Sequence, residues 1–305
     1  MFSYLARRLL QMIPVIMMVT IIVFGLVRLS GDAASIMLPE DATVEEIEVL
    51  RRAMGLDRPL HVQYWYFIRD AARGDFGRSF RYRMSALPLV LERLPATAEL
   101  TLAALVMTVL IAIPAGVTAA IRHNSGIDFT ASSLAVLGRA MPNFWVGIML
   151  ILLFGVILRW LPISGRDGFM SLVLPGITLG TGSAAMATRL MRSSMLEVLR
   201  LDYITTARAK GVSERTVIYR HALRNALIPV VTVVGVQMAR LFGGALITEQ
   251  IFGWPGMGRL MVDSLRGRDM AVVQAGLFMF VLMVMAANLL VDVMYTFIDP
   301  RISYQ

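Results

Sequence analysis

Residues 202–229, DYITTARAKGVSERTVIYRHALRNALIP, form a basic segment between two long apolar runs. Over residues 189–224 the chain carries eight Lys/Arg and three Asp/Glu. Gly211 divides the segment into two short stretches with helical periodicity, because glycine permits a sharp turn between helices. A membrane protein that only anchors a partner or conducts ions needs no more than short polar turns between its spans. We therefore expect a helical elbow on the cytoplasmic side, of the kind on which a separate motor subunit acts.

The composition is that of a membrane protein. The 305 residues are 57% hydrophobic and 16% charged, with a mean hydropathy of +0.69, whereas soluble domains carry roughly 25% charged residues. The net charge of +8 is compatible with nucleic-acid binding, but the arginines lie in loops between apolar runs. The excess of positive charge in cytoplasmic loops and contact with anionic lipid headgroups account for it. We expect membrane lipid, and no nucleic acid, among the partners.

The chain lacks residues that several classes of enzyme need. It has no cysteine, which excludes disulfides and thiolate sites. Its single lysine, Lys210, precedes Gly211, whereas a P-loop requires Lys followed by Ser or Thr. A nucleotide that powers this protein would therefore bind to another chain. His61, His123 and His221 fall in separate regions, and neither HExxH nor GxSxG occurs. We expect a transport subunit without catalytic residues, metal or cofactor of its own.

Six apolar runs are long enough to cross a bilayer, which takes about 20 residues. The first, residues 9–27, contains no charge and follows Arg7 and Arg8. It is longer than the roughly 7–15 residues of a signal-peptide core, so we interpret it as an uncleaved span. The others cover residues 96–120, 130–158, 172–191, 226–247 and 273–295. These runs predict an all-α, polytopic membrane protein with six transmembrane helices.

A polar insert occupies residues 30–94, with nine Arg and ten Asp/Glu. Thr43 and Glu46 have the spacing of a capping box, and Gly55 follows where such a helix would end. Pro59 fits the first turn of a second helix. We expect a small helical lobe on the periplasmic side, between the first two spans.

The charge of the loops orients the chain. The basic loop 192–225 is expected in the cytoplasm together with both termini, whereas the exterior loop 248–272 is neutral. The predicted parts are an N-terminal transmembrane helix at 1–29, the periplasmic insert at 30–94, a transmembrane core at 95–295 and a cytoplasmic tail at 296–305.

Helical stripes predict how the elbow packs. Before Gly211 the apolar positions are Leu196, Leu199, Tyr203 and Ala207. After it they are Ile218, Tyr219, Ala222, Leu223 and Ala226, with Val217 as an exception, opposite Glu214, His221, Arg224 and Asn225. Ser213 is placed to cap the second helix. An amphipathic helix on the lipid surface is the alternative, but it does not explain two helices joined at a glycine.

The elbow resembles the coupling-loop motif of ABC importer permeases, in the form typical of dipeptide and oligopeptide transporters. The match covers Asp202, Tyr203, 206–211, Ser213, Val217 and 220–230. The general importer motif begins Glu-Ala-Ala, whereas this chain has Thr205, Thr206 and Ala207, a departure that the peptide branch shares.

Further motifs extend the resemblance over essentially the whole chain. They are GLDRP at 55–59, QY at 63–64, GDFGRS at 74–79, ERLPAT at 92–97, PNFW at 142–145, LPISG at 161–165, LP at 174–175, EQIFGWPGMG at 249–258 and DPR at 299–301. The usual Pro-Gly-Asp-Pro after the first span is reduced to SGDA at 30–33.

The resemblance implies the permease subunit of an importer with the ABC transmembrane type-1 core, in a bacterial inner membrane. It also implies a second homologous permease, two ATPase subunits that bind ATP and Mg²⁺, and a periplasmic binding protein that delivers dipeptides or oligopeptides. Related importers take glutathione, nickel chelates or other small peptide-like ligands, so the ligand stays open. A stand-alone secondary transporter, which would show inverted repeats and broken spans, is the alternative from another class.

The resemblance places the ATPase contact on the elbow. The residues expected there are Tyr203, Ala207, Arg208, Ala209, Lys210, Gly211, Val212, Ser213, His221, Arg224 and Asn225.

Polar residues inside the predicted spans are candidates for the translocation path, because a charge at the bilayer centre costs roughly 2.5–3.5 kcal/mol and usually faces a cavity or a partner. They are Arg139, Asn143, Gln237, Arg240, Asn288 and Asp292. The alternative is that such residues pair with one another and hold helices together. Arg189 is expected to extend to the membrane interface.

The glycine-rich exterior turn supplies a last set of candidates. Glu249, Phe252, Trp254 and Pro255 are expected to form an outer gate or to dock the binding protein. Aromatic anchoring at the level of the lipid headgroups is the alternative. Pro142 is expected to bend the third span.

Overall fold

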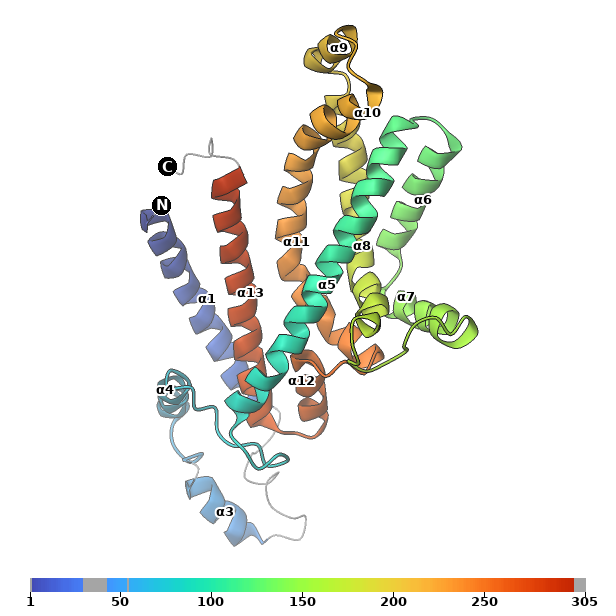
Figure 1. Cartoon of the computed structure of the whole chain (residues 1–305). Coiled ribbons are helices and arrows are strands. Elements are labelled where there is room, and N and C mark those ends of the chain that lie inside the picture. The colour runs from blue at the N-terminus through green and yellow to red at the C-terminus, as the bar shows by residue number, and fades with distance from the viewer. Residues whose placement is uncertain (1, 30–42, 54, 299–305) are drawn as a thin grey trace. The chain divides into compact units, whose positions relative to one another are not determined.

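The computed structural model describes residues 2–29, 43–53 and 55–298, and these are almost entirely helical (Figure 1). Strand pairing within them is limited to a single bridge between Arg78 and Ser85. Five helices are long and apolar enough to cross a membrane, or six spans if a helix pair bent by 113° counts as one. The prediction of an all-α, polytopic fold is confirmed. The motifs at 30–33 and 299–301 lie outside the described residues.

The long helices coincide with the apolar runs and extend beyond them. They are α1 (Phe2–Leu29), α5 (Ala86–Ile121), α8 (Met170–Val198), α11 (Leu223–Ile251) and α13 (Met270–Ile298). Many of their apolar side chains are exposed, including Leu10 and Met18 of α1, at 65% and 64%. Such exposure is favourable in a bilayer, because lipid tails are as apolar as leucine.

The chain forms two compact units, of which the first takes in residues 1–95 and 256–286. It contains the insert helices α3 (Val44–Ala53) and α4 (Leu60–Ala71), and also α12 (Met257–Arg266). The capping box is confirmed, because Thr43 N donates to Glu46 Oε2 at 2.8 Å and Glu46 N to Thr43 Oγ1 at 3.3 Å. The Thr43 backbone amide thereby holds the pKa of Glu46 below its ordinary value.

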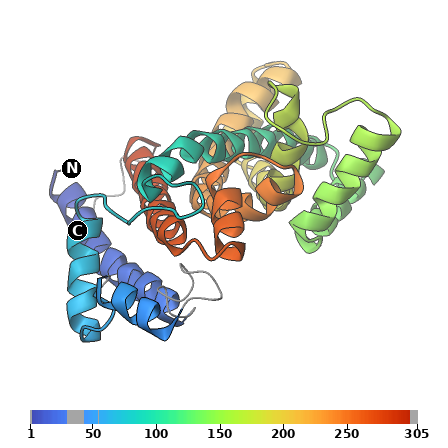
Figure 2. The ribbon, with the colours of Figure 1, turned by 90° about the horizontal axis from the view of Figure 1, so that it is seen from below.

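Two packing contacts give this unit its core. Helix α4 lies against α1 (Figure 2), where the rings of Phe24 and Tyr64 meet edge to face at 5.5 Å. Helix α12 buries an apolar stripe at Met257, Leu260 and Met261 in a cluster that also contains residues of the insert and of α13.

The second unit takes in residues 96–255 and the end of α13 from residue 287. Helix α8 is central to it and packs against α6 (Gly126–Ala140), α7 (Asn143–Leu150) and α11 (Figure 1). It also approaches α5 closely, because a Cβ added to Gly180 would lie 2.7 Å from Ala104 O. Gly176 and Gly180 have the four-residue spacing of small residues that lets membrane helices meet at short range.

The third predicted span, residues 130–158, is broken. Helix α6 ends at Ala140, and α7 with the π-helical η1 (Ile151–Ile157) departs at 113°. The predicted bend at Pro142 is confirmed: proline lacks the backbone N–H that would continue the helix, and Met141 before it is extended, with ψ of 132°.

The close contact between α5 and α8 yields a matched pair of substitutions. Gly180→Ala should lower the stability of the solubilised permease by about 1–3 kcal/mol, because the added methyl overlaps the backbone of Ala104. Gly182→Ala, on the same helix, meets nothing within 4 Å and should leave thermal unfolding unchanged. Equal melting curves for the two variants would contradict this account of the helix contact.

Candidate functional site

The elbow begins where α8 ends at Val198. After a short turn the chain forms α9 (Asp202–Ala209), and then Gly211 adopts a φ of +75°. Gly211 N donates to Arg208 O at 2.9 Å and Val212 N to Ala207 O at 3.2 Å, which closes the end of α9. A Cβ at Gly211 would meet nothing within 4 Å. Glycine is therefore needed because it adopts the left-handed backbone conformation, and not because a side chain would clash with a neighbour.

The second half of the elbow differs from the prediction of two short helices. From Glu214 onward, α10 (Glu214–Thr216), the π-helical η2 (Val217–Ala222) and α11 run on as one helix of 38 residues. Gly211 thus joins a short helix to the cytoplasmic extension of a membrane span. Ser213 occupies the N-cap position as predicted, but its hydroxyl contacts Thr216 Oγ1 at 2.9 Å and caps no backbone amide.

Two residues anchor the elbow in the apolar core. Ile204 and Val217 are both fully buried, in one cluster with side chains of α5, α8 and α11 that include Met191 and Met195. The predicted stripes are correct for Ile218, Ala222 and Ala226, which are buried, and for Leu196, Leu199, Ala207 and Leu223, which are partly buried. They are wrong for Tyr203 and Tyr219, exposed at 39% and 57%.

Local changes of helical phase explain these errors. Helix α8 stops at Val198, so the i, i+3, i+7 register does not continue into α9. In η2 the hydrogen bonds span five residues, and this wider turn brings Val217 to the buried face. The predicted polar face at Glu214, Arg224 and Asn225 is exposed.

Two polar contacts brace α9 against the extension of α11. Arg208 Nη2 donates to Glu214 Oε1 at 2.6 Å and Arg208 Nε to Glu214 Oε2 at 3.1 Å. Asn225 Nδ2 donates to the Tyr203 hydroxyl at 2.7 Å. Exposed pairs of this kind contribute at most about 1 kcal/mol each, but together they orient the short helix.

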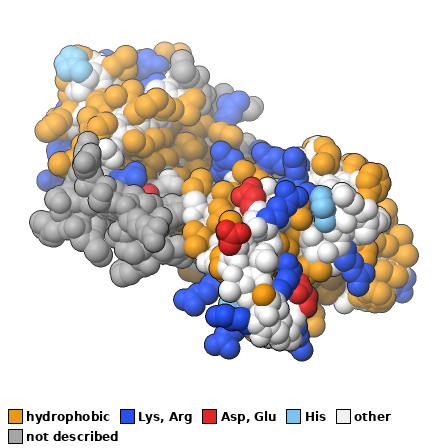
Figure 3. All heavy atoms as spheres, turned by 90° about the horizontal axis from the view of Figure 1, so that it is seen from above, with side chains coloured by type: hydrophobic (Ala, Val, Ile, Leu, Met, Phe, Trp, Pro, Cys, Tyr) orange, Lys and Arg blue, Asp and Glu red, His pale blue; other side chains and the backbone are white. Residues whose placement is uncertain are grey.

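The structure brings the predicted coupling residues together at one tip of the second unit. Exposed there are Tyr203, Arg208, Ala209, Lys210, Gly211, Ser213, Arg224 and Asn225, and partly exposed are Ala207, Val212 and His221. In the view from above, basic side chains surround a few acidic ones over this end (Figure 3).

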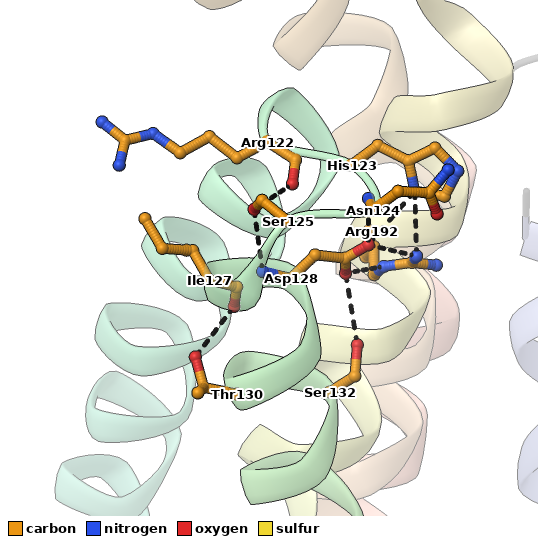
Figure 4. A network of polar contacts seen from close by, with 9 residues as sticks. All are labelled: Arg122, His123, Asn124, Ser125, Ile127, Asp128, Thr130, Ser132 and Arg192. Carbon is orange, nitrogen blue, oxygen red and sulfur yellow. Dashed lines mark hydrogen bonds and ion pairs between the residues drawn. The ribbon is translucent and has the colours of Figure 1, made fainter.

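Beside the elbow, a polar network ties α6 to α8 (Figure 4). Asp128 is only 4% exposed, and its carboxylate accepts from Arg192 Nε at 2.5 Å and Nη2 at 2.7 Å. It also accepts from Asn124 N at 3.0 Å, and His123 Nδ1 lies 3.1 Å away. The network fixes the start of α6 to the end of α8, next to the turn that leads into α9.

Local sequence patterns mark only one end of this network. The spacing of Ser125 and Asp128 resembles the start of a helix, and Ser125 does cap α6 by accepting from Asp128 N at 3.4 Å. That signal identifies a helix end, but not the arginine 64 residues away with which Asp128 pairs.

Four of the six candidates for the translocation path line one pocket of about 210 Å³, formed by α6, α7, α8 and α11. They are Arg139, Asn143, Gln237 and Arg240. Gln237 is buried and its Oε1 accepts from Arg240 at 3.4 Å. Asn288 and Asp292, on α13, do not line this pocket.

The candidates on the exterior turn are mostly buried. Glu249 accepts from Thr97 Oγ1 at 2.6 Å, and Trp254 Nε1 donates to Ala96 O at 2.8 Å. Both side chains, and that of Phe252, are at most 1% exposed, whereas Pro255 is partly exposed. Glu249 and Trp254 thereby hold the end of α11 and the loop after it to α5, whereas Phe252 lies beside Gly147 of α7. In this conformation the three buried side chains present no surface to a binding protein or to lipid headgroups.

Comparison with known proteins places this geometry in a family. The model for the binding-protein-dependent transport system inner membrane component matches residues 112–304, and the model for its N-terminal region matches residues 1–101. The chain is 42% identical to the glutathione transport system permease protein GsiC of Escherichia coli K12, over all of both chains. The GsiC protein of Salmonella typhi is equally similar.

Solved structures support the fold. The chain is similar to a subunit of the MetNI methionine ABC transporter in an inward-facing conformation, with a TM-score of 0.58 and 18% identity over 69% of this chain and 96% of that one. A chain of an amino acid ABC transporter has a TM-score of 0.50, with 18% identity over 68% of this chain and 92% of that one.

The pair between Asp128 and Arg192 predicts a measurable contribution to stability. Asp128→Asn should lower the stability of the solubilised permease by about 2–3 kcal/mol, somewhat less than for a fully buried pair, because Arg192 loses its counter-charge while still partly in contact with solvent. The control is Asp263→Asn, which breaks an exposed pair with Arg259 at 3.8 Å and should change little. Thermal unfolding curves that shift equally for both variants would show that the network does not join α6 to α8.

Proposed function

This chain belongs to the family of binding-protein-dependent transport system inner membrane components, and we propose that its elbow is the surface on which ATPase subunits act. As a member of this family, the chain is the permease subunit of an ABC importer, a multi-pass protein of the bacterial inner membrane. Importers of this family work with ATPase and binding-protein partners. The chain itself is a transport subunit, and we assign ATP and Mg²⁺ to the partner ATPases.

The observation that carries the proposal is the attachment of the elbow. Ile204 and Val217 are buried in the same cluster as side chains of α5, α8 and α11. A force applied to α9 therefore reaches three membrane helices through a packed core. Rigid-body motion can couple the ATPase to the membrane helices only if the elbow is firmly attached to them. Packed elements of this kind switch between discrete arrangements and do not deform continuously.

The contact surface would consist of the exposed residues at the tip. Arg208, Lys210 and Arg224 supply positive charge, and the left-handed Gly211 keeps the end of α9 narrow. Ala207, Ala209, Val212 and Ser213 are small and would allow α9 to enter a groove. Tyr203, His221 and Asn225 would support it from the side.

The assembly that we propose contains a second homologous permease and two ATPase subunits on the cytoplasmic side. A binding protein would deliver the ligand from the periplasm. In this orientation both termini and the elbow are cytoplasmic, in agreement with the basic charge of loop 192–225.

The ligand that we propose is a small peptide, with glutathione, itself a tripeptide, as the first compound to test. This choice is supported by the full-length similarity to GsiC, which is named a glutathione permease. Arg139, Asn143, Gln237 and Arg240 would contact the ligand as it passes, because they line one hollow among four helices.

Substitutions at Gly211 test the coupling proposal at a single position. Gly211→Val should abolish most uptake by the assembled importer, because a β-branched residue at φ +75° is strained by about 1–3 kcal/mol. Gly211→Asn should retain uptake, since asparagine tolerates the left-handed region. Both proteins should reach the membrane in equal amounts.

Copurification supplies the second readout. Tagged wild-type and Gly211→Asn permeases should bring down ATPase subunits in mild detergent, and Gly211→Val should bring down less. The proposal is wrong if the wild type captures no ATPase, or if Gly211→Val captures ATPase and transports as well as the wild type does.

A further inference from the structure

We propose that two pockets that meet at Arg139 form an anion-binding stretch of the translocation path, which binds carboxylates of the transported ligand. The inference rests on the proposed transport function. It adds that the permease itself favours ligands that carry negative charge. The first pocket is the one of about 210 Å³ described above. The second, of about 730 Å³, lies between α6 and α8.

The two pockets are neighbours in the same unit. Arg139, near the end of α6, lines both. Met186 lines the second pocket, and its sulfur accepts a hydrogen bond of 3.1 Å from Gln237 Nε2, which lines the first. Together they follow α8 from Leu179 to Ser193, close to the residues that lead into the elbow.

The charge in these pockets is of one sign. Four arginines line them, from three helices: Arg139, Arg189, Arg192 and Arg240. No Asp or Glu is among the described residues that line either pocket. A positive potential of this kind concentrates anions, because a cleft with low-dielectric walls focuses the field.

Three of these arginines lack a carboxylate partner within the described part of the chain. Arg192 pairs with Asp128. Arg240 donates to the neutral amide oxygen of Gln237 at 3.4 Å, whereas Arg139 and Arg189 form no ion pair with any described residue. The alternative that polar residues of the spans pair with one another is met by Gln237 and Arg240, and not by Arg139 or Arg189.

The depth of Arg139 in its span calls for a cavity or a partner. Arg139 lies 13 residues after the start of α6, about 20 Å along the helix axis. A charge at such depth in a membrane span is retained only where it faces a cavity or a partner. The volume of the second pocket falls within the roughly 300–1,000 Å³ of small-molecule sites, so there is room for a ligand.

The chemistry of arginine indicates a carboxylate. Its planar guanidinium binds a carboxylate through two parallel hydrogen bonds, and its charge does not depend on pH in the physiological range. Every peptide with a free C-terminus carries at least one carboxylate, and glutathione carries two. A ligand can therefore pass from Arg240 to Arg139 and on to Arg189 while it keeps an ionic contact.

The walls of the path are suited to passage. Gly138, Gly182 and Gly244 line the first pocket, and a Cβ added to Gly182 would meet nothing within 4 Å. The glycines add no side chain to this pocket, and its charged side chains are those of Arg139 and Arg240. The site would thus bind an acidic group and make few contacts with the rest of the ligand.

The test is uptake by the complete importer in proteoliposomes, with binding protein and ATPases. The probes are glutathione and its glycine-amide derivative, each at a concentration that saturates the binding protein. Arg139→Gln and Arg240→Gln should each lower glutathione uptake about tenfold, the effect of losing one charge-assisted hydrogen bond. Uptake of the amide should fall less than about threefold, since that ligand has lost one of the groups that the arginines bind.

Matched variants separate charge from structure. Arg139→Lys and Arg240→Lys keep the charge but lose the paired hydrogen bonds of the guanidinium, so they should restore part of the glutathione uptake. Arg159→Gln, an exposed arginine outside both pockets, should behave as the wild type does. Hydrolysis of ATP without ligand should be unchanged in all these variants.

Equal losses for glutathione and its amide would overturn the inference, because the arginines would then hold helices together or pair with carboxylates of the second permease. An absence of any loss would overturn it as well.

Equilibrium binding of both probes to the permease complex without binding protein gives a readout independent of transport. If the wild-type complex binds acid and amide equally, the inference is wrong even where the importer works. If no ATPase copurifies, the proposed function fails instead.

Discussion

The burial of Ile204 and Val217 is the interaction on which the rest of the second unit depends. These two side chains come from either side of the Gly211 turn and enter one apolar cluster with residues of α5, α8 and α11. Without them, α9 would be held only by the partly buried Ala207 and by exposed contacts worth at most about 1 kcal/mol each. With them, the basic tip is continuous with the packed helices, and displacement of the tip has to move the helices.

Helix α8 connects this anchored tip with the polar pockets. Its glycines bring it against α5, and Arg192 pairs with Asp128 at the start of α6. The face of the same helix that carries Arg189 and Gly182 lines the hollows in which Arg139 and Arg240 lie. One rigid element thus carries both the support of the elbow and a wall of the proposed path. A change at the elbow can therefore alter the pockets without a flexible intermediary.

Much of this arrangement follows from local sequence signals. Apolar length predicted the long helices, Gly211 predicted the break in the elbow, and Pro142 predicted the bend of the third span. The signals failed where a tertiary contact or a change of helical phase decides the outcome. Tyr203 and Tyr219 were placed on buried stripes because a regular period was assumed across the end of α8 and through η2. The pair between Asp128 and Arg192 joins residues far apart in sequence, and no local pattern marks it.

Contact between the elbow tip and the ATPase can be measured through the reactivity of a single thiol. The natural chain has no cysteine, so Lys210→Cys introduces one exposed thiol at the tip. The rate of maleimide labelling is compared between the permease alone and the permease with its ATPases, with Arg159→Cys as a control outside the tip. The ATPases should protect position 210 and leave position 159 reactive. Equal labelling of position 210 in both states would contradict the proposed contact.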